Sequence, residues 1–228
     1  MITVLLLILT AIISYCLGCV SGSMVLSTYV FRNNSVKHGR MESPITDFFH
    51  DFGPIGAVLL VLFDLAKTML AVLIGGALLS LVDQMTVGRL FAAFCLILGH
   101  AYPLLFLFKG GKAILCAGIA VFMIDWRVGL CCWVAYVVVV IFTRYTALGA
   151  VAAAAFAAIF MGVFDHTGLE GMLALLCAGI IVLRYAENLL RIAGGTEPRS
   201  FDFSRLSKKD AKNTGAAGED EENEEDFY

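Results

Sequence analysis

The chain has 228 residues, of which 60% are hydrophobic and only 15% are charged, and its mean hydropathy is +0.86. A soluble domain of this size cannot bury so much apolar surface, so the composition excludes an ordinary water-soluble protein and favours an integral membrane protein. The formal net charge of −3 mainly reflects the C-terminal end, because seven of the 19 acidic residues lie between Glu219 and Asp226.

The apolar residues form long runs, and a helix needs roughly 17 to 25 of them to cross a bilayer. Four runs are clearly long enough: residues 2–31, 54–82, 87–108 and 169–193. Three shorter runs, 113–124, 128–143 and 147–164, are separated by charged residues around Asp125 and Arg144. A charge at the bilayer centre costs about 2.5 to 3.5 kcal/mol, so we expect these charges at an interface. The sequence therefore predicts an all-α polytopic protein with about seven transmembrane helices, the fourth and fifth short.

Lysine and arginine residues collect on alternate connections between these runs. One side would hold Arg32, Lys37, Arg40, Lys109, Lys112, Arg144, Arg191, Arg199, Arg205, Lys208, Lys209 and Lys212, and the other only Arg89 and Arg127. By the positive-inside rule, the N-terminus lies outside and the C-terminus inside. We expect a membrane domain over residues 1–199 and a cytoplasmic, acidic, disordered tail over residues 200–228.

The first candidate site is the segment in which Lys109 and Lys112 flank Gly110 and Gly111, between two predicted spans. Glycines let backbone N–H groups approach an anion closely, and the lysines and the start of the next helix add positive charge. This combination is typical of a phosphate-binding loop, although it does not match the P-loop of nucleotide-binding proteins. The alternative is a basic turn whose lysines reach the lipid headgroups.

Two further groups of polar residues lie within apolar runs. Arg184, Asn188 and Arg191 share one face of the last predicted helix, where they could bind an anion or form an ion-pair ladder with Glu187. Asp64 and Lys67 are three residues apart inside another span, where they either serve function or neutralise each other.

Together these segments resemble the acyl-phosphate-dependent glycerol 3-phosphate acyltransferases of bacterial membranes, the PlsY family, over about residues 15–197. The most specific part runs from Gly99-His100 through Pro103 to Lys109-Gly110-Gly111-Lys112, supported by Asp64-Leu65-Ala66-Lys67, Thr143-Arg144-Tyr145, Asn188-Leu189-Leu190-Arg191 and Gly195-Thr196-Glu197.

The resemblance implies an enzyme of phospholipid synthesis in the bacterial inner or plasma membrane. It would transfer an acyl chain from acyl phosphate to the 1-hydroxyl of glycerol 3-phosphate and so make lysophosphatidic acid. The implied partners are these two substrates and membrane lipid, with no metal, no cofactor, no acyl-CoA and no nucleic acid.

The resemblance also implies roles for particular residues. His100, Arg144 and Asn188 would act at the catalytic centre. The phosphate groups would be bound by Thr46, Lys109, Gly110, Gly111, Lys112 and Arg191. Asp64, Lys67 and Glu197 would support them.

The glycine-rich loop of the family is degenerate over residues 39–53, where only Gly39, Thr46 and Gly53 agree with the pattern. The family tends to have histidine at Tyr185, and Ala113 also departs from it. Three carboxylates, Glu42, Asp47 and Asp51, now lie in a loop that would face phosphates, and Coulomb repulsion opposes binding there.

This loop leaves other functions open. The alternatives are a catalytically impaired homologue that binds a phosphorylated lipid or a partner protein, and a divergent acyltransferase with another acceptor. A small transporter is a weaker alternative, since the sequence shows no inverted repeat.

Overall fold

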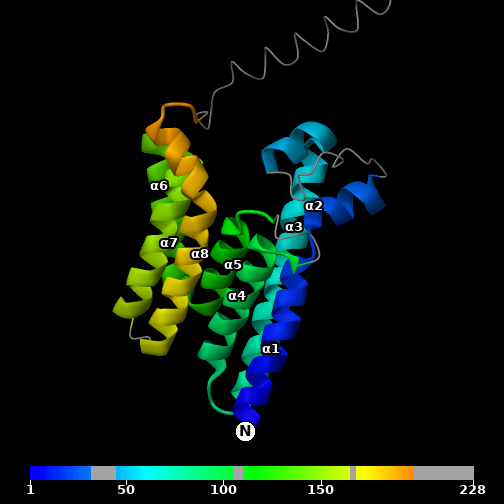
Figure 1. The fold of residues 1–228 in the computed structure, drawn as a ribbon, viewed down its shortest axis with the longest axis vertical. Coiled ribbons are helices and arrows are strands. Elements are labelled where there is room, and N and C mark those ends of the chain that lie inside the picture. Colours follow the sequence, from blue (N-terminus) through cyan, green and yellow to red (C-terminus); the bar gives the residue numbers. More distant parts are fainter. Residues whose placement is uncertain (32–44, 105–109, 165–167, 198–228) are drawn as a thin grey trace, which may run out of the picture.

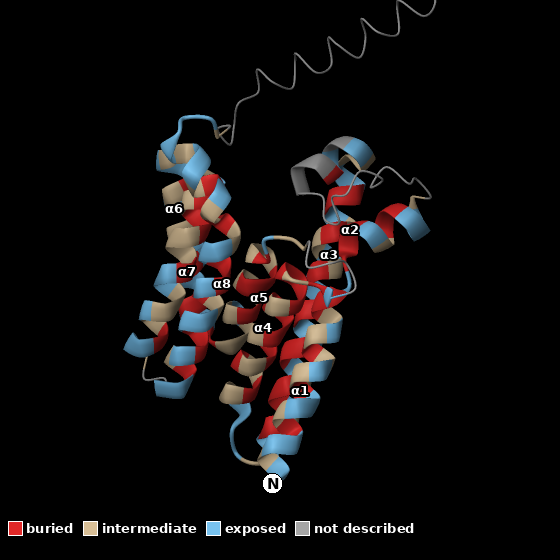
Figure 2. Cartoon of the chain, viewed as in Figure 1, coloured by how far each residue is buried: buried red, intermediate tan, exposed pale blue. Residues whose placement is uncertain are grey.

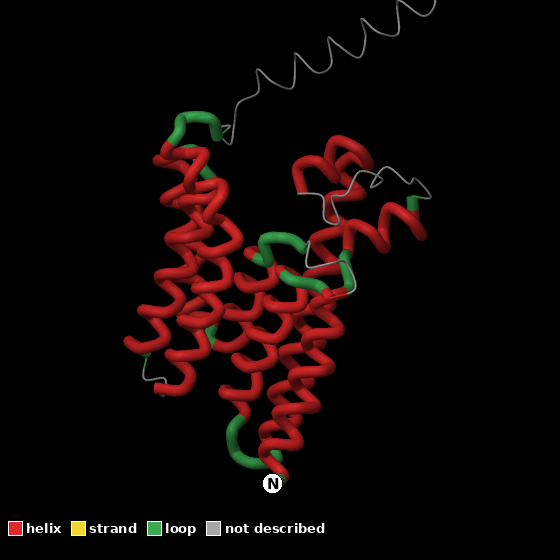
Figure 3. Tube along the Cα trace, viewed as in Figure 1, coloured by secondary structure: helices red, strands yellow, loops and turns green. Residues whose placement is uncertain are grey.

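The computed structural model describes residues 1–31, 45–104, 110–164 and 168–197, and the regular structure in these ranges is helical (Figures 1 and 3). The helices are α1 (Ile2–Cys19), α2 (Gly22–Val25), the π-helical turn η1 (Leu26–Val30), α3 (Ile45–Ser80), α4 (Met85–Ala101), α5 (Ile114–Ile124), α6 (Trp126–Thr143), α7 (Thr146–Val163) and α8 (Gly168–Ala193). The side chains of residues 45–47 and 50 lie outside the description. The predicted all-α polytopic class is confirmed.

Within the described residues, five helices are long and apolar enough to cross a membrane: α1, the part of α3 from Asp51 to Ser80, α6, α7 and α8. Helix α5, with 11 residues, is short as expected, but α4 is shorter than predicted, because it ends at Ala101 after 17 residues instead of continuing through the run 87–108. The fifth run was expected to be short, and this was wrong, because α6 starts at Trp126 and has 18 residues. The N-terminus and the end of α8 lie at opposite ends of the bundle (Figure 1). The count of seven spans and the orientation stay predictions.

The first apolar run does not form one helix, contrary to expectation. Helix α1 ends at Cys19, Val20 is extended, and the Ser21 side chain caps α2 by accepting a hydrogen bond from the Met24 amide. A single helix over residues 2–31 would be about 45 Å long, against a hydrocarbon core of about 30 Å. The break at Val20 keeps α1 close to the thickness of the membrane and frees the Val20 carbonyl for another partner.

The second long helix begins at Ile45, earlier than predicted, but it is sharply kinked at the expected start. Gly53 has φ +71° and ψ −172°, a conformation that favours glycine, and Pro54 follows it. On the N-terminal side of the kink, Phe48 and Phe52 pack with Phe31, with Phe52 and Phe31 stacked at 4.5 Å between ring centroids. This aromatic cluster joins the chain after η1 to the start of α3.

The helices form two neighbouring groups. One contains α1, α3, α4 and α5, the other contains α6, α7 and α8, and contacts of α4 with α8 and of α5 with α6 join them (Figure 1). Buried residues lie between the helices, whereas the outward faces expose apolar side chains such as Leu5, Val134 and Leu183 (Figure 2). An apolar exterior around a packed interior is what a lipid environment requires.

Gly18 in α1 and Gly99 in α4 let these two helices touch through their backbones. A Cβ atom at Gly18 would overlap the carbonyl oxygen of Leu96, and one at Gly99 would overlap that of Tyr15. We therefore expect Gly18→Ala to lower the free energy of unfolding by about 1 to 3 kcal/mol, because the helices must move apart. Thermal melting in detergent measures this change.

Gly162 in α7 provides the matched control, because a Cβ atom there meets nothing within 4 Å. Gly162→Ala should leave the melting temperature unchanged or raise it, since alanine favours a helix over glycine by about 1 kcal/mol. If Gly18→Ala melted like Gly162→Ala, the close contact between α1 and α4 would be refuted.

Candidate active site

A pocket of about 470 Å³ lies between the two helix groups, where α4 ends and α5 begins. Its lining comes from α2, α3, α4, α5, α7, α8 and the loop before α5, and includes Ser23, Asp64, His100, Gly110, Gly111, Lys112, Cys116, Thr146, Arg184, Tyr185, Glu187, Asn188 and Arg191. Most of the predicted site residues are therefore brought together from distant parts of the sequence.

The loop before α5 is fixed by hydrogen bonds from both sides. The Gly111 amide donates to the His100 carbonyl at 3.1 Å, and the Arg184 guanidinium donates to the carbonyls of Gly110 and Gly111. Arg184 also lies over the Tyr102 ring, 5.3 Å from its centroid. A Cβ atom at Gly110 would overlap the His100 carbonyl oxygen, so this position requires glycine. The Gly111 amide would be available to a phosphate only after its bond to His100 opened.

Lys112 supplies the positive charge at this loop. Its side chain is exposed at the pocket, and its Nζ lies over the Tyr185 ring, 4.8 Å from the centroid. Partial burial lowers the pKa of Lys112, partly offset by the negative charge of Glu197. The next residue, Ala113, has φ +55°, a left-handed conformation that turns the chain into α5. Lys109, predicted as the second phosphate ligand, lies outside the described residues.

The buried pair of Asp64 and Lys67 is joined to His100. The Lys67 Nζ lies 2.8 Å from Asp64 Oδ1, 2.9 Å from His100 Nδ1 and 3.1 Å from the Val20 carbonyl oxygen. The two charges neutralise each other, as one of the two interpretations held, and the ammonium also satisfies the carbonyl at the break after α1. Because the ammonium donates to Nδ1, the imidazole proton is expected on Nε2.

Asp64, His100 and Cys116 each offer a metal-ligating atom, all within 4.8 Å of one another. The Lys67 ammonium already contacts the carboxylate and the imidazole of this group. A metal ion would have to displace that positive charge. The residues present therefore do not fit a resident metal, and the expectation of a metal-free enzyme stays a prediction.

On α8, Asn188 and Arg191 point to a common acceptor. Asn188 Nδ2 donates to Glu197 Oε1 at 2.5 Å, and Arg191 Nε donates to Glu197 Oε2 at 2.7 Å. Arg184 donates to the loop before α5, and Arg191 pairs with Glu197. The predicted ion-pair ladder of Arg184, Glu187 and Arg191 along α8 is therefore not formed by these two arginines. The Glu197 carboxylate orients an amide and a guanidinium at the edge of the pocket.

The stability supplied by Glu197 should depend on pH. Burial acts to raise the pKa of Glu197, but the hydrogen bonds from Asn188 and Arg191 outweigh it and hold the pKa below its ordinary value of 4.5. A carboxyl group whose pKa is lowered on folding stabilises the folded state above its unfolded pKa, and this contribution is lost as the pH falls through the folded pKa. We therefore expect Glu197→Gln to lower the melting temperature at pH 7, with the difference from native shrinking progressively as the pH falls below 4.5. A difference that stayed constant as the pH was lowered would contradict this role.

Arg144 is placed differently from the prediction. Arg144 is exposed at the end of α6 with φ +62° and does not line the pocket, to which Thr146 contributes instead. Thr46 lies in the first turns of α3, and its side chain is outside the description. Sequence reasoning missed Ser23, Cys116 and Thr146, because nothing in their apolar surroundings marks them. Arg184 was already a candidate on the face of the last predicted helix, and Tyr185 could have been found from its position three residues before Asn188.

The fold and the pocket define a class: a polytopic helical membrane protein with a basic, polar pocket at one end of its bundle. Residues 8–195 match the family model described as glycerol-3-phosphate acyltransferase. The chain belongs to this family of membrane acyltransferases.

Curated relatives agree with the family model over most of the chain. A glycerol-3-phosphate acyltransferase of Cereibacter sphaeroides is 31% identical over 85% of this chain and 89% of its own length. One of Thermoanaerobacter pseudethanolicus is 26% identical over 84% of this chain and 94% of its own. The bacterial relatives and the apolar helices identify a multi-pass protein of the bacterial plasma membrane.

The fold is also that of a solved structure. The crystal structure of PlsY, an integral membrane glycerol 3-phosphate acyltransferase, in its glycerol 3-phosphate form has a TM-score of 0.73 to this chain at 23% identity. The match covers 88% of this chain and 98% of the PlsY chain. This likeness confirms the fold that the sequence resemblance implied.

Proposed function

We propose that this protein transfers an acyl chain from acyl phosphate to the 1-hydroxyl of glycerol 3-phosphate and releases lysophosphatidic acid and inorganic phosphate. The observation that carries the proposal is the pocket itself, in which Lys112 and the α8 residues Asn188 and Arg191 surround a space of about 470 Å³ at one end of a membrane bundle. Relatives and the PlsY structures carry the matching names, with glycerol 3-phosphate and lysophosphatidic acid forms among them.

The reaction asks little covalent chemistry of the protein. The glycerol hydroxyl oxygen attacks the acyl carbonyl carbon, the bond from that carbon to the phosphate oxygen breaks, and phosphate leaves with the electron pair. The hydroxyl proton passes to a phosphate oxygen, so no protein nucleophile and no metal is required. The protein contributes by bringing two anions together and orienting them, which is the main source of rate enhancement in such a step.

The described residues divide between these tasks. Lys112 offsets phosphate charge, and the guanidinium of Arg191 and the amide of Asn188 lie at the same pocket. His100, held by Lys67, would present its Nε2 proton as a donor. Arg184 fixes the loop that carries Lys112. Arg144 does not line the pocket, and its catalytic role stays a prediction. The predicted roles of Thr46 and Lys109 also stay predictions, because the Thr46 side chain and all of Lys109 lie outside the described residues.

The test is a phosphate-release assay on the purified protein in detergent. With palmitoyl phosphate and glycerol 3-phosphate together, we expect phosphate release that depends on both substrates and on protein concentration. Replacing palmitoyl phosphate by palmitoyl-CoA should give no transfer. Release that did not require glycerol 3-phosphate would instead indicate a hydrolase, and transfer from palmitoyl-CoA would refute the proposed donor.

A further inference from the structure

Within the described residues, the ammonium of Lys112 lies against an aromatic ring and forms no salt bridge to a carboxylate. Its Nζ lies 4.8 Å from the centroid of the Tyr185 ring. Among the described carboxylates, Glu197 has the largest electrostatic effect on Lys112, but its two oxygens already accept hydrogen bonds from Asn188 and Arg191. The ring therefore restrains the lysine without forming a salt bridge to it.

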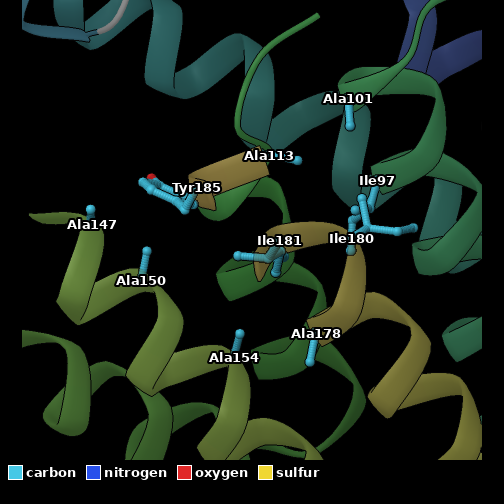
Figure 4. Close-up of a cluster of buried hydrophobic side chains, with 11 residues drawn as sticks. Ile97, Ala101, Ala113, Ala147, Ala150, Ala154, Ala178, Ile180, Ile181 and Tyr185 are labelled. Carbon is cyan, nitrogen blue, oxygen red and sulfur yellow. The ribbon is translucent and has the colours of Figure 1, made fainter. Parts of the chain in front are cut away.

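The Tyr185 ring is itself held rigidly. Its side chain is only 5% exposed and belongs to a cluster of buried residues from α4, α5, α7 and α8. Figure 4 shows the ring extending from α8 toward the α7 residues Ala147 and Ala150, whose small side chains leave room for it. The neighbouring residue, Arg184, holds the same loop by the carbonyls of Gly110 and Gly111. Two consecutive residues of α8 thus fix both the backbone and the charged group of the loop.

An aromatic contact suits a phosphate-binding lysine for a physical reason. A carboxylate partner would neutralise the ammonium and occupy its N–H donors, whereas a ring face attracts the charge and leaves donors free. Lysine also has a long stem with several rotatable bonds, so an unrestrained ammonium loses considerable rotamer entropy when it binds a ligand. Restraint by the ring reduces that loss before the ligand arrives.

We propose that Tyr185 is a positioning residue, whose ring face holds the Lys112 ammonium at the pocket so that it meets the phosphate group of a substrate. This inference rests on the proposed function, because it takes Lys112 as a phosphate ligand. It assigns Tyr185 an action through Lys112, without contact between Tyr185 and the reacting atoms.

The test is a double-mutant cycle on phosphate binding. Calorimetry would measure the affinity of inorganic phosphate and of glycerol 3-phosphate for the native protein and for Tyr185→Leu, Lys112→Ala and the double variant. Tyr185→Phe is the conservative variant, because it keeps the ring and loses only the hydroxyl. Thermal melting of each variant checks that it is folded.

We expect Tyr185→Leu to weaken binding about 2- to 30-fold, the range of a lysine contact with an aromatic ring, and Tyr185→Phe to remain within about two-fold of native. In the Lys112→Ala background, Tyr185→Leu should cause no further loss, because its partner is gone. The inference would be overturned if Tyr185→Leu weakened phosphate binding as much in the Lys112→Ala background as in the native protein. It would also be overturned if Tyr185→Leu bound phosphate like native, or if Tyr185→Phe and Tyr185→Leu lost equal affinity.

Binding does not require turnover, so the two proposals fail in different ways. A native protein that binds phosphate but transfers no acyl chain would refute the proposed function, while the cycle would still decide the role of Tyr185. If the enzyme is active but the affinity losses of Tyr185→Leu and Lys112→Ala add up in the double variant, only the role of Tyr185 is refuted.

Discussion

Replacing Lys67 by methionine should destabilise the protein by about 3 to 5 kcal/mol, because it leaves the charge of Asp64 buried without its partner. The Lys67 ammonium also donates to His100 Nδ1 and to the Val20 carbonyl, and both acceptors would lose their donor. Asp64, Lys67 and His100 are all buried, and only Asp64 and His100 border the pocket, so water can replace the lost contacts only from that side. Thermal melting in detergent, together with acyl transfer, would measure the effect.

The double variant Asp64→Asn, Lys67→Met is the control for this prediction. It removes both charges, so it should recover much of the stability lost in Lys67→Met. It should not recover full activity, because the donor that orients His100 is still missing. If Lys67→Met melted like the native protein, the buried pair would be unimportant for the fold.

Replacing Lys112 by alanine should weaken the binding of a phosphate ligand by about 1.5 to 3 kcal/mol, or about 10- to 150-fold, the contribution of a hydrogen bond to a charged group. The lysine lines the pocket at the start of α5 and supplies its charge. Arg89→Ala, which removes a positive charge at the opposite end of α4, is the matched control and should bind like native. If the native protein and Lys112→Ala bound phosphate with equal affinity, the prediction would be wrong. The loop would then be a basic turn that contacts lipid headgroups.

The lowered pKa of Lys112 predicts that phosphate affinity depends on pH. Partial desolvation at the pocket lowers the pKa of Lys112 below the ordinary lysine value of 10.5, so its charge is lost at a lower pH than that of a fully solvated lysine. Phosphate affinity should accordingly fall as the pH rises toward 10.5 in the native protein. Lys112→Arg should flatten this fall, because arginine stays charged over the whole range.

Most of the helices and the polar residues between them could be predicted from the sequence. Hydrophobic runs located α5, α7 and α8 to within a residue or so at each end, and the charged positions Asp125 and Arg144 fall between helices as expected. The break after α1 was missed, because Ser21-Gly22-Ser23 is its only local signal and no charge or proline accompanies it in the apolar run. Its stabilising contact comes from Lys67, 47 residues away.

The members of the site were easier to predict than their partners. The segment around Lys112 and the α8 face carrying Asn188 and Arg191 stand out as polar groups within apolar runs. The links of Lys67 to His100 and of Arg184 to Gly111 join residues 33 and 73 positions apart, and only the packed bundle brings them together. The acidic substitutions between Gly39 and Gly53 fall mainly outside the described residues, so their effect on turnover stays a prediction.

The most direct test of the central claim is the identity of the product. Purified protein would be incubated with palmitoyl phosphate and glycerol 3-phosphate, and the lipid extract analysed by mass spectrometry alongside released phosphate. We predict palmitoyl lysophosphatidic acid and phosphate in equal amounts from the native protein, with a large loss of both in Lys112→Ala. A folded native protein that binds glycerol 3-phosphate but forms no lysophosphatidic acid would contradict the account.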